Sequence, residues 1–280
     1  MWAIIGGSGF EHFTGIEELQ PLERKTPFGL ASSGLRKIHF KGRECIFLPR
    51  HGQNHELSPS EVNYRANIFA LKASGVQRLI SISAVGSLKF DLKPGDLVVP
   101  SQYIDRTKGI RAPSFCGNGV VGHVSLAKPI WRGGADAVKT IKPQLDFAAH
   151  FDKTYVCIEG PYFSTQAESN TYREMKADII GMTNFPEFAL AREAGIAYLP
   201  CCFVTDYDCW DDSIEHVTIQ EVLATMKKNN SKAVELIDAI LKADPDADLS
   251  CREGGLKNGL MTPRESMQEA QRSMLDVICS

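Results

Sequence analysis

The sequence predicts an α/β fold, with a mixed, mostly parallel central sheet flanked by helices. Two observations carry this prediction. Short apolar segments alternate with segments of helical periodicity, and the apolar segments end at turns rich in glycine, proline and aspartate. Hydrophobic residues make up 43% of the 280 residues, ample for a buried core. Alternation of this kind predicts parallel strands covered by helices on both faces.

The predicted strands are short apolar segments closed by turn residues. They are expected at residues 2–5, 44–49, 78–85, 97–100, 153–158, 178–182 and 196–205. The first ends in the glycine turn Gly6-Gly7-Ser8-Gly9, and the second ends at Arg50-His51-Gly52.

The predicted helices show an apolar face at helical spacing. They are expected at residues 63–74, 135–149, 168–176, 186–195 and 219–243, with a last one near 263–278. Thr218 is the expected N-cap of the helix over 219–243. The segment 110–131 is irregular and polar, and a loop of this length is typically functional or disordered. Without internal repeats or a clear linker, residues 1–280 are expected to form one domain, in which 244–280 is a more polar tail.

Composition argues against several classes of protein. The net charge is −3 and no long basic run occurs, so a nucleic-acid partner is not expected. No apolar run approaches the roughly 18 residues of a transmembrane helix, and residues 1–10 are expected to be a strand and not a signal peptide. The 8 cysteines are scattered without zinc spacing. They are interpreted as mostly small buried hydrophobes in the reducing cytoplasm, with no metal site.

Three donor-rich loops follow predicted strands, where the ligands of parallel sheets bind. They are Gly6-Gly7-Ser8-Gly9, Arg50-His51, which His55 could join, and Ser83-Ala84-Val85-Gly86-Ser87. Singly, each could be an ordinary turn, an exposed loop or a close-packed strand exit. Together they favour a compact oxyanion site. The first loop lacks the dinucleotide pattern because His12 stands where that pattern needs glycine, and no Walker A loop occurs.

An acidic segment, Asp206-Tyr207-Asp208, follows the apolar run 197–204. On an extended backbone, residues two apart face the same way, so two carboxylates are expected side by side. An ionised carboxylate can accept from the adenine N6 amino group and a protonated one can donate to N7. Neighbouring like charges raise one pKa, which favours such a mixed state. A solvated acidic turn that caps the next helix is the open alternative.

The sequence resembles the trimeric purine nucleoside phosphorylases from Ala3 to near Ile240. The motifs are individually weak, but their order and spacing are specific. They are Thr26-Pro27-Phe28-Gly29, Arg50-His51-Gly52, Val62-Asn63-Tyr64-Arg65-Ala66-Asn67, Ser83-Ala84-Val85-Gly86-Ser87, Pro94-Gly95-Asp96, Ile104-Asp105-Arg106-Thr107, Glu159-Gly160-Pro161, Gly181-Met182-Thr183, Pro186-Glu187 and Thr205-Asp206-Tyr207-Asp208-Cys209-Trp210.

The resemblance implies a role for each matching residue. The implied phosphate ligands are Ser8, Arg50, His51, Ser83, Ala84 and Thr183. The implied nucleoside contacts are Met182 at the ribose and Phe163, Ser164, Gly86, Tyr207, Asp206 and Asp208 at the base. Asp206 and Asp208 are also the implied catalytic residues. Family members that act on 6-oxopurines have asparagine in this segment, so aspartate agrees with a 6-aminopurine.

The resemblance also implies what surrounds the 5′ substituent. Ile219, Val222 and Leu223 are the expected contacts, and relatives that act on ordinary nucleosides have a histidine where Ile219 stands. An apolar wall suits a methylthio group better than a hydroxyl. His123 matches a residue that reaches into a neighbouring site, which implies a homotrimer. The tail aligns poorly from Ser250 onward, and Leu260 or Met261 is expected to supply its contact to the 5′ pocket.

The expected reaction is therefore phosphorolysis of 5′-methylthioadenosine to adenine and 5-methylthioribose 1-phosphate, in purine and methionine salvage. Inorganic phosphate is the expected co-substrate, with no metal and no organic cofactor, and Asp206 is expected to protonate adenine N7 as it leaves. Two alternatives stay open. One is a phosphorylase for methylthioinosine or another purine nucleoside, and the other is a non-catalytic purine-binding protein on the same fold.

Overall fold

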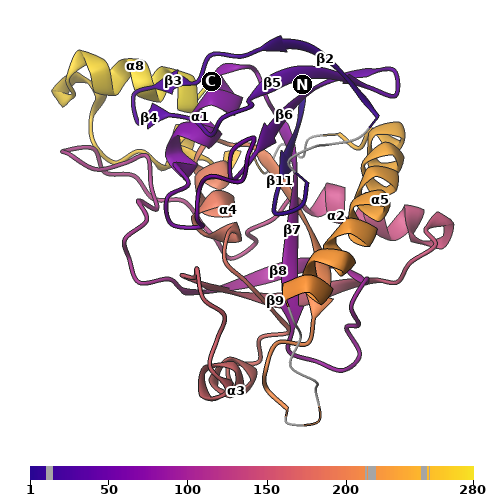
Figure 1. Ribbon diagram of the computed structural model, residues 1–280. Helices are drawn as coiled ribbons and strands as arrows, with labels where there is room; N and C mark the ends of the chain where they lie inside the picture. Colours follow the sequence, from indigo (N-terminus) through magenta and orange to yellow (C-terminus); the bar gives the residue numbers. More distant parts are fainter. Residues whose placement is uncertain (11–14, 212, 214–218, 247–250, 252) are drawn as a thin grey trace.

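A twisted sheet runs through the centre of the computed structural model (Figure 1). The structure describes residues 1–10, 15–211, 213, 219–246, 251 and 253–280, without the side chains of Ile219 and Glu221. Within these residues the sheet has nine strands in the order β10-β9-β8-β11-β7-β1-β6-β5-β2. The strands are β1 (Trp2–Gly6), β2 (Ile16–Pro21), β5 (Arg36–Phe40), β6 (Arg43–Pro49), β7 (Arg78–Ser87), β8 (Leu97–Arg106), β9 (Ala149–Ile158), β10 (Ile179–Gly181) and β11 (Ala197–Asp206). A small hairpin, β3 (Lys25–Thr26) with β4 (Gly29–Leu30), lies apart from it.

The strand directions confirm a mixed sheet whose centre is parallel. Strand β1 pairs in parallel with β6 and β7, and β7 pairs in parallel with β11. On the other side, β9 is parallel to β8 and β10, while β11 and β8 meet antiparallel. Strands β6, β5 and β2 form an antiparallel edge. The carboxyl ends of β1, β6, β7 and β11 therefore meet at one edge, where the predicted ligand loops lie.

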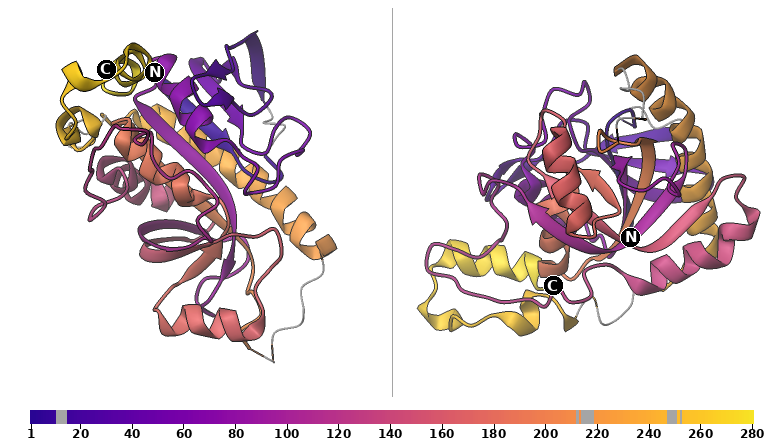
Figure 2. Two further views of the ribbon diagram at one scale, coloured as in Figure 1. Left: turned by 90° about the vertical axis from the view of Figure 1, so that its left-hand side faces the viewer. Right: turned by 90° about the horizontal axis from the view of Figure 1, so that it is seen from below.

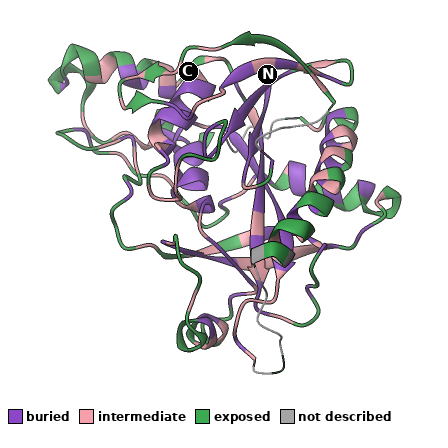
Figure 3. Cartoon of the chain, viewed as in Figure 1, coloured by how far each residue is buried: buried purple, intermediate pink, exposed green. Residues whose placement is uncertain are grey.

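Helices cover both faces of the central strands. The helices are α1 (Tyr64–Ala73), α2 (Arg132–Ile141), α3 (Gln166–Glu174), α4 (Asn184–Glu193), α5 (Ile219–Ala243), α7 (Leu256–Gly259) and α8 (Glu269–Ile278). Helices α1, α4 and α8 pack on one face, and α2 and α5 on the other (Figure 2). Alternate residues of β1 enter the two cores, with Ala3 and Ile5 on the α1 side and Trp2 and Ile4 on the α5 side. Burial on both faces explains why these strands are continuously apolar (Figure 3).

Several predicted boundaries were wrong. The strand expected at 97–100 extends over Leu97–Arg106. The helix expected at 135–149 begins at Arg132 and ends at Ile141, because Pro143 follows in a short 3-10 turn and β9 already starts at Ala149. Strands β2 to β5 were not predicted. Strand β2 is almost wholly exposed and lacks an apolar pattern. The expected N-cap Thr218 lies outside the described residues.

The tail forms a compact addition beside α1. Helix α8 covers Glu269–Ile278 and packs against α1, with Met274, Leu275 and Ile278 in the same core as β1. A 3-10 turn, Arg264–Ser266, precedes α8 and occupies the start of the expected helix near 263–278. No helix among the described residues combines the length and apolar character needed to cross a bilayer.

Candidate functional site

A cavity of about 580 Å³ opens at the carboxyl ends of the parallel strands. Residues following β1, β6, β10 and β11 line it, together with the end of β7 and one side of α5. Most of the expected site residues meet there: Ser8, Arg50, His51, Ser83, Ala84, Gly86, Phe163, Ser164, Met182, Thr183, Asp206, Asp208 and Val222. His55, which could join the Arg50-His51 loop, also lines the cavity.

Two expected nucleoside contacts, Tyr207 and Leu223, do not line the cavity of this chain. The Tyr207 ring packs towards Phe90, with ring centroids 6.0 Å apart. Leu223 is 57% exposed and also lies outside the cavity wall, because adjacent helical residues point about 100° apart. The Ile219 side chain lies outside the described part of the structure.

His123, expected to reach into a neighbouring site, is exposed and does not line this chain's cavity. Its backbone N–H donates to the Gly259 carbonyl at 2.8 Å. The adjacent Gly122 forms a bridge with Leu260, and Met261 donates to the Val121 carbonyl. The His123 loop and the tail residues Leu260 and Met261 thus form one continuous surface.

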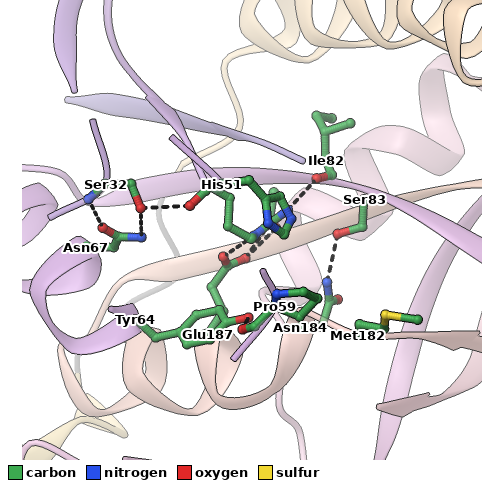
Figure 4. A network of polar contacts seen from close by, with 12 residues as sticks. Ser32, His51, Pro59, Tyr64, Asn67, Ile82, Ser83, Met182, Asn184 and Glu187 are labelled. Carbon is green, nitrogen blue, oxygen red and sulfur yellow. Dashed lines mark hydrogen bonds and ion pairs between the residues drawn. The ribbon is translucent and has the colours of Figure 1, made fainter. Parts of the chain in front are cut away.

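A buried ion pair between Arg50 and Glu187 organises one end of the cavity. We call this end, beside Arg50, Ser8 and Ser83, the anion end. Arg50 is fully buried, and its Nε and Nη2 donate to the two Glu187 oxygens at 2.7 and 3.0 Å (Figure 4). Nη2 also donates to Ser81 Oγ at 2.7 Å, and Nη1 to the Ile82 carbonyl at 3.1 Å. Burial opposes the charge, but Glu187 outweighs it and raises the Arg50 pKa, so the guanidinium stays charged.

Arg50 was expected to hold phosphate with its planar fork. In the structure the fork grips Glu187, and one N–H, on Nη1, has no acceptor among the described residues. Nη1 lies beside the glycine loop: a Cβ added to Gly7 would lie 2.7 Å from it and 2.7 Å from the Ile82 carbonyl oxygen. Glycine at this position lets the loop that carries Ser8 approach the charged group.

His51 presents a defined ring to the same end of the cavity. Its Nδ1 lies 2.8 Å from the Leu57 carbonyl oxygen, which can only accept, so Nδ1 carries a proton. The ring stacks on His55 with centroids 4.7 Å apart. Thr183, the N-cap residue of α4, lines the cavity and makes no side-chain capping bond. The polar side chains of His51, His55 and Thr183 thus line the cavity together with Arg50.

At the opposite end, the two carboxylates meet through a turn. Strand β11 ends at Asp206, and Asp208 has a positive φ of 54°. The Asp208 backbone N–H donates to Asp206 Oδ1 at 2.8 Å. The extended backbone expected here was therefore wrong, and the proximity of the carboxyl groups results from this side-chain-to-backbone turn.

Burial raises the pKa of both carboxyl groups. For Asp208 the pKa rises to about 6, where burial is reinforced by the Asp206 charge and opposed by Ser169, which donates to Oδ2 at 2.5 Å. The pKa of Asp206 is raised by burial against the hydrogen bonds from Thr205 and Asp208. Gly86 makes room for the pair, because a Cβ there would lie 3.1 Å from Asp206 Oδ1.

A second buried ion pair, between Arg111 and Glu159, contacts loops that line the cavity. Arg111 Nε donates to Glu159 Oε1 at 3.1 Å and Nη2 to the Glu159 carbonyl at 2.6 Å. Nη1 donates to the carbonyls of Met182 and Phe185 at 2.6 and 2.8 Å. Glu159 also accepts from Ser60 and from the Lys108 backbone. These contacts join four loops around the cavity, and we call them the Arg111 network.

Sequence reasoning missed Arg111, Ile180 and Met226. Arg111 lies near the start of the irregular segment 110–131, which was expected to be functional or disordered, but nothing in the sequence pairs it with Glu159. Met226 follows Val222 by one helical turn, so helical spacing could have placed both on the cavity side of α5. Among the described residues, no group of three or more His, Cys, Asp or Glu side chains is arranged to hold a metal ion.

Residues 2–242 match the family described as the phosphorylase superfamily. Two similar proteins are S-methyl-5′-thioadenosine phosphorylases. That of Geobacter sulfurreducens is 40% identical over 276 residues, 98% of this chain and 96% of the relative. That of Koribacter versatilis is 41% identical over 276 residues, 98% of this chain and 94% of the relative.

Solved structures agree in fold. A methylthioadenosine phosphorylase sourced from an antarctic soil metagenomic library has a TM-score of 0.90 at 42% identity, covering 99% of this chain and 98% of its own. A mutant adenosine/methylthioadenosine phosphorylase from Schistosoma mansoni, in complex with methylthioadenosine, has a TM-score of 0.81 at 32% identity, with coverage of 99% and 96%.

Removal of the Arg111 side chain should destabilise the protein strongly. Arg111→Gln leaves the buried Glu159 carboxylate without its charged partner, so we expect a loss of about 3–5 kcal/mol in the free energy of unfolding. Arg106→Gln, at an exposed position slightly earlier in the sequence, is the matched control. It should change the free energy of unfolding by less than about 0.5 kcal/mol. Urea unfolding at a fixed protein concentration measures both. Equal effects of the two variants on the free energy of unfolding would show that the Arg111 network does not stabilise the protein.

Proposed function

The chain belongs to the phosphorylase superfamily, and on that basis we propose that it catalyses phosphorolysis of S-methyl-5′-thioadenosine to adenine and 5-methylthioribose 1-phosphate. One observation carries this proposal: a single cavity joins an anion end beside Arg50 to a pair of buried carboxyl groups, Asp206 and Asp208. The similar proteins named above support the same substrate. The enzyme would be a pentosyltransferase.

The anion end supplies donors suited to phosphate. We assign phosphate to the hydroxyls of Ser8, Ser83 and Thr183, the remaining N–H of Arg50, the Ala84 segment and the His51 ring, all of which line the cavity. Because His51 Nδ1 already donates to Leu57, the ring donates to phosphate through Nε2 in its charged form. Because Arg50 is neutralised by Glu187, most of the binding would come from hydrogen bonds and not from an unpaired charge. That balance suits a co-substrate that must leave the site as part of a product.

The carboxyl end suits adenine. Asp208 in its ionised form would accept from the N6 amino group, and Asp206 in its protonated form would donate to N7. Burial raises the pKa of both carboxyl groups, so the pair retains a proton more readily than exposed aspartates do, and this role requires that proton to lie on Asp206. Phe163, Ser164 and Met182 also line the cavity, and we assign the first two to the base and Met182 to the ribose.

The proposed steps balance as follows. The C1′–N9 bond lengthens and positive charge develops on the ribose, next to the phosphate anion that stabilises it. The proton of Asp206 moves to N7, so adenine leaves as a neutral base. A phosphate oxygen then forms the new bond to C1′, and Asp206 regains its proton from solvent. These steps use phosphate as co-substrate and call for neither a metal nor an organic cofactor.

Val222 and Met226 on α5 would face the 5′ methylthio group, because both line the cavity. We further propose a homotrimer in which the surface formed by His123, Leu260 and Met261 serves a neighbouring subunit's cavity. The exposure of His123 and the 66% exposure of Met261 support that assignment. The buried free thiols Cys45, Cys157, Cys201 and Cys202 support a reducing, cytoplasmic location.

Asp206→Ala should lower turnover far more than stability. Loss of the general acid is expected to reduce kcat by about 10²- to 10⁴-fold. Asp91→Ala, at an exposed position outside the cavity, is the control and should retain wild-type turnover. The measurement is release of adenine and 5-methylthioribose 1-phosphate, with and without phosphate, alongside the melting temperature of each variant. Unchanged phosphorolysis in Asp206→Ala would refute the assignment.

The activity should also depend on the protonation of Asp208. As the pH falls through the Asp208 pKa of about 6, the carboxylate gains a proton and no longer accepts from the N6 amino group. We therefore expect kcat/KM for the 6-amino substrate to decline below about pH 6, while Asp208→Asn lacks this limb. Asp208→Asn should also shift the preference towards methylthioinosine, because its amide can donate to a 6-oxo group. A pH–rate profile of Asp208→Asn that matches the wild type would contradict the base assignment.

A further inference from the structure

A buried amide, that of Asn184, lies directly behind the anion end of the cavity. Asn184 is 0% exposed and follows Thr183 at the start of α4. Its Nδ2 donates to Ser83 Oγ at 2.9 Å (Figure 4), and its Oδ1 accepts from Tyr103 Oη at 3.0 Å. Neither Asn184 nor Tyr103 lines the cavity, whereas Ser83 does. A chain of three side chains thus leads from β8 to the end of β7.

The neighbours of Asn184 determine which way its amide faces. Two donors approach Oδ1, the Tyr103 hydroxyl at 3.0 Å and the Cys202 thiol at 4.0 Å. Burial raises the pKa of both Tyr103 and Cys202, so both groups keep their protons. A flipped amide would set its NH2 group against two protonated donors, which is unfavourable. The NH2 group therefore faces Ser83.

This orientation determines what the Ser83 hydroxyl can do. Its oxygen already accepts from Asn184, so its own proton needs an acceptor elsewhere. No acceptor for that proton is found in the part of the chain that the structure describes. Ser83 is 2% exposed and borders the cavity, so an anion bound there is the acceptor within its reach.

We propose that Tyr103 and Asn184 are positioning residues that make the Ser83 hydroxyl a hydrogen-bond donor towards phosphate. The inference rests on the proposed function, in which phosphate is the co-substrate. Asn184 supplies the direction of the hydrogen bond, and Tyr103 holds the amide in that direction. A serine with a free rotor would divide its time between donating and accepting, and an acceptor lone pair would repel the anion. The two residues act through Ser83 alone and touch no substrate.

Tyr103→Phe tests the inference with the smallest change. The ring stacks on Phe188 with centroids 4.0 Å apart, so the packing survives while the hydroxyl is lost. We expect the KM for phosphate to rise about fivefold, equivalent to one neutral hydrogen bond, and the KM for the nucleoside to stay within about twofold. Tyr172→Phe removes the hydroxyl of another buried tyrosine, one that does not line the cavity, and should leave the KM for phosphate unchanged.

A double-mutant cycle separates this role from a general structural one. In a Ser83→Ala background, Tyr103→Phe should raise the KM for phosphate by no more than about 1.5-fold, because the group it orients is gone. The same fivefold rise in both backgrounds, or no rise in either, would overturn the inference. If Tyr103→Phe does not fold, Asn184→Asp serves in the same cycle. Its carboxylate accepts from Ser83, so its effect on the KM for phosphate should be at least about fivefold larger with Ser83 present than in the Ser83→Ala background.

The proposed function and the inference fail in distinguishable ways. A wild-type protein that releases no product in response to phosphate refutes the function itself. A wild-type protein that depends on phosphate but gives an additive cycle refutes only the positioning role. Thermal stabilisation by inorganic phosphate alone is a second readout, and it should be weaker in Tyr103→Phe than in the wild type and in Tyr172→Phe.

Discussion

The buried pair of Arg50 and Glu187 is the constraint on which the anion end depends. Glu187, on α4, accepts from Arg50 after β6, from Ser81 in β7 at 2.6 Å and from Tyr198 in β11 at 2.8 Å. One carboxylate thus joins a helix to three neighbouring parts of the sheet. A buried ion pair seldom adds net stability, but loss of one partner is costly because the other charge is left buried. Its effect here is geometric, since it fixes where β6 ends relative to β7 and α4.

Strand β7 sets the distance between the two ends of the cavity. Ser83 lies at the anion end and Gly86 beside the carboxyl pair, and β11 pairs with both, since Ser83 lies opposite Cys202 and Gly86 opposite Asp206. Three residues of extended strand span about 10 Å, which leaves room for a sugar between phosphate and base. The register shift between Val204 and Asp206 ends the pairing at the point where the carboxyl turn begins. The spacing of the reacting groups therefore follows from the sheet, and the loops supply only the chemistry.

Much of the site could be predicted because strand ends are visible in the sequence. The predicted strand before Arg50 ends with β6 at Pro49, and the predicted strand 196–205 ends one residue before β11 ends at Asp206. Arg50, Asp206 and Asp208 accordingly line one cavity, as residues at strand ends were expected to do. Partners distant in sequence could not be predicted. Nothing in the sequence around Glu187 indicates that it takes up the Arg50 fork, or that Arg111 reaches Glu159, because each pairing is decided by tertiary packing. The exposed strand β2 was missed for a related reason, since its pairing with β5 stabilises a segment whose own pattern is polar.

The two ends of the cavity also differ in how strictly they can select a substrate. At the carboxyl end, buried polar groups need partners, so a base that fails to pair leaves Asp206 or Asp208 unsatisfied, and hydrogen-bonding sites of this kind discriminate by roughly 10⁴-fold or more. The α5 wall formed by Val222 and Met226 has no such requirement. An apolar wall rejects a hydroxyl by only about a hundredfold. In the proposed function, strict selection of the base would therefore follow from the β11 turn. Selection of the 5′ group would depend on the packing of one helix face, and changes on α5 would alter it without disturbing the sheet.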